Sequence, residues 1–80
     1  MDDKDILARV GELVSEERAL RERSIGSGLR EDERIRLTDV EARLDQCWDL
    51  LRQRRARLEF GEDPAGATER PAWEVEGYES

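Results

Sequence analysis

Leucines recur every seven residues through the middle of the chain, and this spacing limits the fold more than any other feature. The seam that they form with two apolar residues and one arginine is Leu37, Val40, Leu44, Cys47, Leu51, Arg54 and Leu58. Residues seven apart lie on one side of a helix, so the pattern predicts one long helix over residues 30–60. A helix with a single apolar seam needs a partner surface that buries it.

An apolar stripe with helical spacing also occupies the start of the chain. Its members, interrupted by Glu17, are Ile6, Val10, Leu13 and Leu20. The spacing predicts a helix over residues 3–24, with Asp2 or Asp3 at its N-cap. Between the two stripes, Gly26 and Gly28 favour a turn.

Blocks of charge predict that the two helices run antiparallel. Residues 1–17 sum to −4 and residues 18–30 to +3, while residues 31–45 sum to −3 and residues 46–58 to +3. A chain that folds back at the glycines places the acidic start of each helix beside the basic end of the other. Exposed ion pairs of about 0.2–1 kcal/mol each then select this orientation over a parallel one. We therefore predict an all-α fold, with a coiled-coil-like antiparallel two-helix hairpin over residues 1–60.

The C-terminal residues 61–80 differ in composition from the helices. They contain two prolines, three glycines and six acidic residues against one arginine, so we predict an extended, irregular acidic tail that is either mobile or laid along the helices. One buried seam is thin support for a fold of this size. We expect a second copy to form a homodimeric four-helix bundle and to cover Leu58 and Phe60 at the free end of the longer helix. The alternative cover is the tail itself, through Trp73, Val75 and Tyr78.

Composition excludes several classes of protein. No stretch approaches the roughly 18 apolar residues of a membrane span, and the acidic N-terminus MDDKD is not followed by the apolar segment of a signal peptide. We therefore expect a cytoplasmic protein without membrane contact. The single cysteine cannot form an internal disulfide, and its place in the seam predicts a core role for Cys47.

No catalytic, cofactor-binding or metal-binding set stands out in the sequence. The chain has no histidine that would activate Cys47 or complete a ferritin-like metal site. Asp45 and Asp49 lie four residues apart on one helical face, but two carboxylates alone are a weak signal for a cation site. We therefore expect neither an enzyme nor a metalloprotein, and no cofactor.

Two groups of residues are candidates for binding a partner. They are the arginine cluster and the tail aromatics, namely Arg52, Arg54, Arg55, Arg57, Trp73 and Tyr78. The arginines either pair with acidic residues of the same protein, contact a partner protein or bind nucleic acid. For Arg54, within the seam, we expect an ion pair with Glu17 or Asp3. The aromatic residues either dock on the hairpin or form a short linear motif for another protein.

These features predict a small non-catalytic protein that acts as a protein–protein interaction or regulatory module. The alternative is a nucleic-acid-associated factor that uses the arginines of segment 52–57. The net charge of −7 and the lack of aromatic residues among these arginines favour a protein partner.

A resemblance to a known family lies in the run LDQCWDLLRQRRAR, residues 44–57. Together with the GEDP, RP and VEGY segments that follow, it resembles small actinobacterial proteins grouped as domain-of-unknown-function family 2630. The resemblance implies a short helical protein and no established function. A serine or aspartate often opens the second helix in that family, whereas Arg30 stands there in this chain, with Ser27 as the alternative cap.

Overall fold

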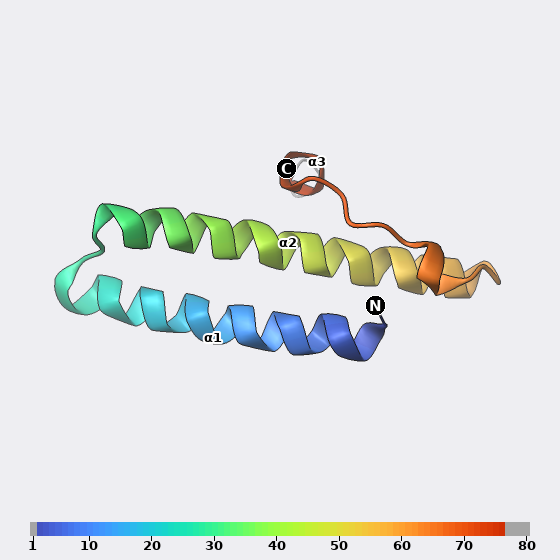
Figure 1. Ribbon diagram of the computed structural model, residues 1–80, viewed down its shortest axis with the longest axis horizontal. Helices are drawn as coiled ribbons and strands as arrows, with labels where there is room; N and C mark the ends of the chain where they lie inside the picture. Colours follow the sequence, from blue (N-terminus) through green and yellow to red (C-terminus); the bar gives the residue numbers. More distant parts are fainter. Residues whose placement is uncertain (1, 77–80) are drawn as a thin grey trace.

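The protein is a helical hairpin in a computed structural model that describes residues 2–76. Helix α1 (Asp3–Ser27) and helix α2 (Glu31–Glu59) lie side by side in opposite directions (Figure 1). A 3-10 helix, η1 (Pro64–Gly66), and a short helix, α3 (Ala72–Glu76), follow. No strand occurs in this part of the chain, so the predicted all-α antiparallel hairpin is confirmed. None of the described helices contains a stretch apolar and long enough to cross a lipid bilayer.

Local capping determines where α1 begins and ends. The Asp2 side chain accepts a hydrogen bond from Asp5 N–H at 2.9 Å, as expected of an N-cap. Gly26 remains helical, and α1 continues to Ser27, which is therefore not the cap of the second helix. The chain leaves helical geometry at Gly28, whose φ of +77° is a conformation that glycine adopts at little cost.

Helix α2 begins and ends with hydrogen bonds that its own residues supply. Arg30 is the N-cap, and its backbone N–H donates to the Glu33 carboxylate at 3.1 Å. At the C-terminus Gly61 has a φ of +72°, and the Glu62 N–H donates to the Arg57 carbonyl at 2.7 Å. This arrangement is a Schellman motif, which satisfies the last carbonyls of the helix.

The core is the seam between α1 and α2. Its buried cluster consists of Ile6, Val10, Leu13, Val40, Leu44, Cys47 and Leu50. Ion pairs cross between the two helices and join Asp3 to Arg54, Glu16 to Arg36, Arg21 to Glu41 and Arg23 to Glu33. Most of them connect the acidic start of one helix with the basic end of the other, as the blocks of charge predict.

Residues 62–76 return along α2 (Figure 1), so this part of the tail takes the second of its two expected placements and lies along the hairpin. The structure differs from the sequence-based expectation in one respect, because η1 and α3 form at the two prolines. Pro64 opens η1 behind Asp63, and the Pro71 carbonyl accepts the first hydrogen bonds of α3, including one from Val75 N–H at 3.2 Å. A proline lacks the backbone N–H, but the first turn of a helix does not use that donor, so both prolines stand where helices start.

Truncation after Gly61 should leave the hairpin folded but less stable. The buried cluster is drawn from α1 and α2, whereas the tail contributes Val75, whose side chain is 1% exposed. Losing that burial should lower the free energy of unfolding by about 1.5–3 kcal/mol. Circular dichroism should then show both long helices with a reduced melting temperature. A collapse of the helical signal would instead make the tail an essential part of the fold.

Candidate interaction surface

Helix α2 has three faces, and each meets a different environment. The core face contacts α1 through the buried cluster. The tail face holds the returning tail and consists of Gln46, Asp49 and Gln53. The open face borders α1 on one side and consists of Glu41, Asp45, Trp48, Arg52 and Arg55, a stripe with a helical spacing of three or four residues. The tail face and the open face are the surfaces on which a functional site can lie.

The tail face binds the backbone of the tail with polar side chains. The Gln53 amide donates to the Thr68 carbonyl at 2.7 Å and accepts from the Thr68 N–H at 3.3 Å. The Gln46 amide donates to the Arg70 carbonyl at 3.3 Å. A primary amide has both N–H donors and a carbonyl acceptor, so it can pair with the N–H as well as the C=O groups of an extended backbone. The tail therefore runs antiparallel to α2 and is held by α2 side chains.

Asp49 and Arg70 form a buried ion pair within this face. Asp49 is 1% exposed, and Arg70 donates from Nε to its Oδ2 at 2.9 Å and contacts Oδ1 as well. The Gln53 amide donates to the same carboxylate at 2.9 Å. The hydrogen bonds from Arg70 lower the pKa of the Asp49 carboxyl by more than burial raises it, and the bond from Gln53 lowers it further. The pKa of this carboxyl therefore lies below its usual range.

The sequence carries a signal for this contact that the prediction missed. Gln46, Asp49 and Gln53 are spaced by three and four residues, so they mark a polar stripe on a face of α2 distinct from the leucine seam. Asp49 is bound to Arg70 and does not form the weak cation site considered with Asp45. Within residues 2–76 no three potential ligand side chains gather where they could hold a metal ion.

The arginines of the predicted cluster are spread around α2 instead of forming one basic patch. Adjacent residues of an α-helix are about 100° apart, so a run of this spacing points in several directions. Arg54 pairs with Asp3, as the sequence predicts. Arg55 pairs with Glu59 at 3.4 Å, and Arg57 pairs with Glu62 at 3.6 Å. Arg52 is exposed on the open face.

Trp73, the tail aromatic among the described residues, does not cover the hairpin. Trp73 is 76% exposed, and Leu58 and Phe60 at the end of α2 are exposed as well, so of its two interpretations the docking of Trp73 on that end does not hold. Val75 makes the buried contact of α3 instead. Tyr78 lies outside the described residues. Trp73 is therefore available to a partner, as its alternative interpretation requires.

Cys47 has the properties of a core residue. Its thiol is free and buried, and burial raises the pKa of that thiol above its usual value. A raised pKa leaves little thiolate near neutral pH, and the thiolate is the nucleophilic form.

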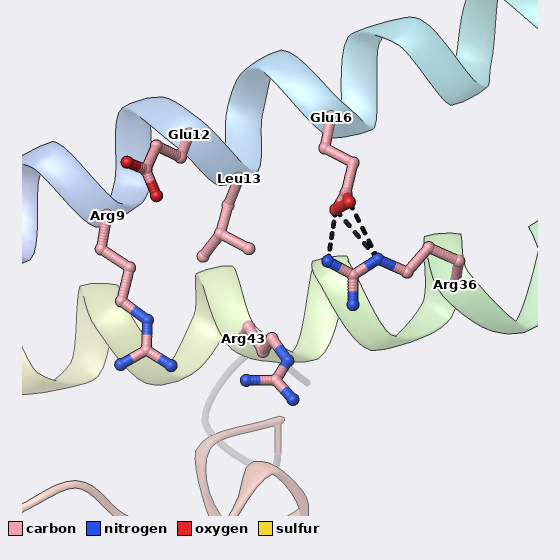
Figure 2. A pocket seen from close by; sticks show the side chains of 6 residues that line it. All are labelled: Arg9, Glu12, Leu13, Glu16, Arg36 and Arg43. Atoms are coloured by element: carbon pink, nitrogen blue, oxygen red, sulfur yellow. Dashed lines mark hydrogen bonds and ion pairs between the residues drawn. The ribbon is translucent and has the colours of Figure 1, made fainter.

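Shallow grooves follow the junction between α1 and α2. One, of about 250 Å³, is lined by Arg9, Glu12, Leu13, Glu16, Arg36 and Arg43 (Figure 2). Two of its three arginines serve internal pairs, since Arg36 donates to Glu16 at 2.9 Å and Arg43 to Asp39 at 2.8 Å. Another, of about 340 Å³, lies beside the open face and is lined by Val14, Glu17, Arg21, Glu41, Leu44, Asp45 and Trp48. The second groove combines apolar walls with charges of both signs, which suits a protein surface better than a small anion.

Comparison with known proteins finds relatives along nearly the whole chain. Residues 2–80 match the protein family described as "Protein of unknown function (DUF2630)". An uncharacterized protein of Mycobacterium tuberculosis and one of Mycobacterium bovis are each 51% identical over 77 residues, which is 95% of this chain and 88% of each relative. No solved structure matches the chain.

Proposed function

The chain belongs to the DUF2630 family of proteins of unknown function, as the resemblance predicts, and we propose that it is a non-catalytic module that binds proteins through the helical surface of its hairpin. We place this module in the cytoplasm, where the single thiol of Cys47 stays reduced.

The observation that carries this proposal is the number of large apolar side chains at the surface. Both tryptophans are among them, together with Leu7, Ile25, Ile35, Leu58 and Phe60. Single exposed apolar residues are ordinary, but tryptophan is enriched where one protein binds another. Trp48 also forms a wall of the larger groove, so an aromatic anchor and a recess lie together on one face.

The chemistry of the remaining groups supports a binding role over a catalytic one. Cys47 is buried with a raised thiol pKa, and the chain has no histidine that would serve as its base. The most buried carboxylate of the described residues, that of Asp49, is held by Arg70 and Gln53, so it is engaged in the fold. A carboxylate with a lowered pKa is a poor general acid or base near neutral pH.

The dispersion of the arginines disfavours the nucleic-acid alternative. A protein that follows a phosphate backbone presents its basic residues on one face. Here Arg54 and Arg57 serve ion pairs with Asp3 and Glu62, and only Arg52 and Arg55 share the open face. Measurable affinity for DNA or RNA near 50 mM salt, falling steeply as salt rises, would reverse this judgement.

Self-association is part of the proposal. The described core is one seam between two helices, and Trp48 beside it remains 43% exposed. A second hairpin packed on the first would form a four-helix bundle, in which Trp48 becomes buried. A homodimer is the smallest closed assembly that achieves this.

Site-specific photo-crosslinking in an actinobacterial host tests the proposed function. A photoreactive amino acid placed at Trp48 or at Trp73 should give discrete adducts with protein, either with a second copy or with another chain. The matched control is the same amino acid at Glu22, an exposed residue of α1. Absence of adducts at both tryptophan positions, or equal adducts at Glu22, would contradict a protein-binding role for this surface.

A further inference from the structure

The open face of α2 has opposite charges on the two sides of Trp48. Asp45 lies about one turn before the tryptophan and Arg52 about one turn after it, while Glu41 and Arg55 lie about two turns away on the same two sides. The stripe therefore reads acidic, acidic, tryptophan, basic, basic. Neither α1 nor the tail covers its centre, since Trp48 is 43% exposed and Arg52 and Arg55 are exposed.

From this arrangement we infer that the open face is the interface of a symmetric homodimer, in which α2 packs antiparallel to α2 of the second copy around a twofold axis at Trp48. The inference deepens the self-association put forward under the proposed function and rests on it. A twofold axis makes each contact occur twice, so the surface has to be complementary to itself. The stripe meets this condition, because reversing its direction exchanges the acidic half with the basic half.

The antiparallel orientation follows from which charges meet. With the axis at Trp48, Asp45 lies opposite Arg52 of the second copy, and Glu41 lies opposite Arg55 of the second copy. A parallel pairing in register would place each of these charges opposite its own copy. Exposed ion pairs contribute little stability, but like charges brought together select against the wrong orientation.

The apolar centre of this interface supplies its stability. The groove beside Trp48 has apolar walls from Val14 and Leu44 and a volume of about 340 Å³. Around the twofold axis, Trp48 of each copy lies against the other copy near its groove. Aromatic residues that fill a recess at the centre of an interface carry much of the binding energy. Leu7 lies two helical turns before Val14 on the same side of α1 and extends the apolar area.

Two of these charges, Glu41 and Arg55, already take part in exposed pairs within one copy, and the interface can extend those pairs. Arg21 donates to Glu41 at 3.0 Å, and Arg55 lies 3.4 Å from Glu59. A carboxylate has two oxygens and a guanidinium has five N–H donors, so each accommodates a further partner. Antiparallel packing therefore joins the pairs of one copy to those of the other.

The available surface is large enough for a stable dimer. A standard interface buries about 800 Å² on each partner, which is about a seventh of the 5794 Å² that this chain exposes. Helix α2 has 29 residues and is about 43 Å long at 1.5 Å per residue, and the neighbouring side of α1 widens the contact.

Sedimentation equilibrium of the full chain and of charge-reversal variants tests the interface. The wild-type chain should form a dimer. Arg52→Asp and Asp45→Arg should each weaken it by about tenfold or more, because each creates two like-charge contacts across the axis. The double variant Asp45→Arg/Arg52→Asp should recover most of the wild-type affinity, since it exchanges the two signs. Glu22→Arg, a charge reversal away from the open face, should have no such effect.

A second variant separates packing from charge. Trp48→Ala should give a folded monomer, because Trp48 lies outside the buried cluster of the hairpin. Circular dichroism of every variant confirms that the helices are present. A wild-type monomer at high micromolar concentration, a dimer that ignores the single reversals, or a double variant no better than the single ones would each overturn the inference. Adducts with other proteins at Trp48 or Trp73 would still support the proposed function in those cases, so the two failures are distinguishable.

Discussion

Leu44→Asp should unfold the hairpin, whereas Leu58→Asp, at the same heptad position two repeats later, should leave it folded. Leu44 belongs to the buried cluster, whereas Leu58 is 58% exposed. The first substitution removes a core side chain and places a charge where the surroundings are apolar. It should cost about 4 kcal/mol or more of the free energy of unfolding. A chain of 80 residues whose core is one seam between two helices has little stability beyond that amount.

Circular dichroism with urea titration measures this contrast. The Leu58→Asp variant is the matched control, since it makes the same chemical change in the same helix. Its free energy of unfolding should change by less than about 1 kcal/mol, as is usual for surface substitutions. An unchanged melt of the Leu44→Asp variant would show that this leucine does not face α1. A comparable loss in both variants would place the end of α2 against a surface that the single chain does not provide.

The contrast between these two leucines shows how far the heptad pattern predicts the fold. The spacing identifies one side of α2 correctly, because periodicity is a property of the helix itself. The spacing does not tell how far α1 extends along α2. Helix α1 begins at Asp3, which pairs with Arg54, so the part of α2 after Arg54 extends beyond the start of α1. The extent of the core therefore depends on the turn, where the chain passes through Gly26 and reverses after Gly28.

The candidate site is harder to predict, because residues that are adjacent in the sequence do not share one side of a helix. The arginines of segment 52–57 appear as one feature in the sequence, but helical geometry distributes them over different sides of α2. The informative spacing was that of three or four residues. It separates the open face around Trp48 from the tail face around Asp49. The partner of Asp49, Arg70, comes from a segment without periodicity, so no local pattern identifies it.

Removing Arg70 should destabilise the protein more than removing Asp49. Asp49 is 1% exposed, whereas the Arg70 side chain is 27% exposed, so an orphaned arginine can reach water and an orphaned aspartate cannot while the tail stays in place. Breaking a buried pair from one side costs about 3–5 kcal/mol. In Arg70→Met the tail should therefore detach and let Asp49 hydrate. The loss of stability should then approach that of truncation after Gly61, which sets its upper limit.

A double-mutant cycle measures the pair directly. Arg70→Met, Asp49→Leu and the combined variant are compared by urea unfolding, and limited proteolysis reports whether the tail is bound. The combined variant should be more stable than Arg70→Met alone, because two apolar side chains replace the pair without leaving a buried charge. Additive losses in the combined variant, with the tail protected from protease throughout, would contradict a coupled pair.

The pH dependence of the same site provides a second test. The bond from Arg70 holds the pKa of Asp49 below its usual range, while in the unfolded chain an aspartate titrates near about 3.9. The folded state therefore binds the proton less readily than the unfolded state. Stability from this site should be fully present above about pH 4 and lost as the pH falls through the lowered folded pKa. Asp49→Asn cannot titrate there, so its difference in unfolding free energy from the wild type should be constant near neutral pH and should shrink in acid. A difference that stays constant into acid would mean that Arg70 does not hold the ionised carboxylate in solution.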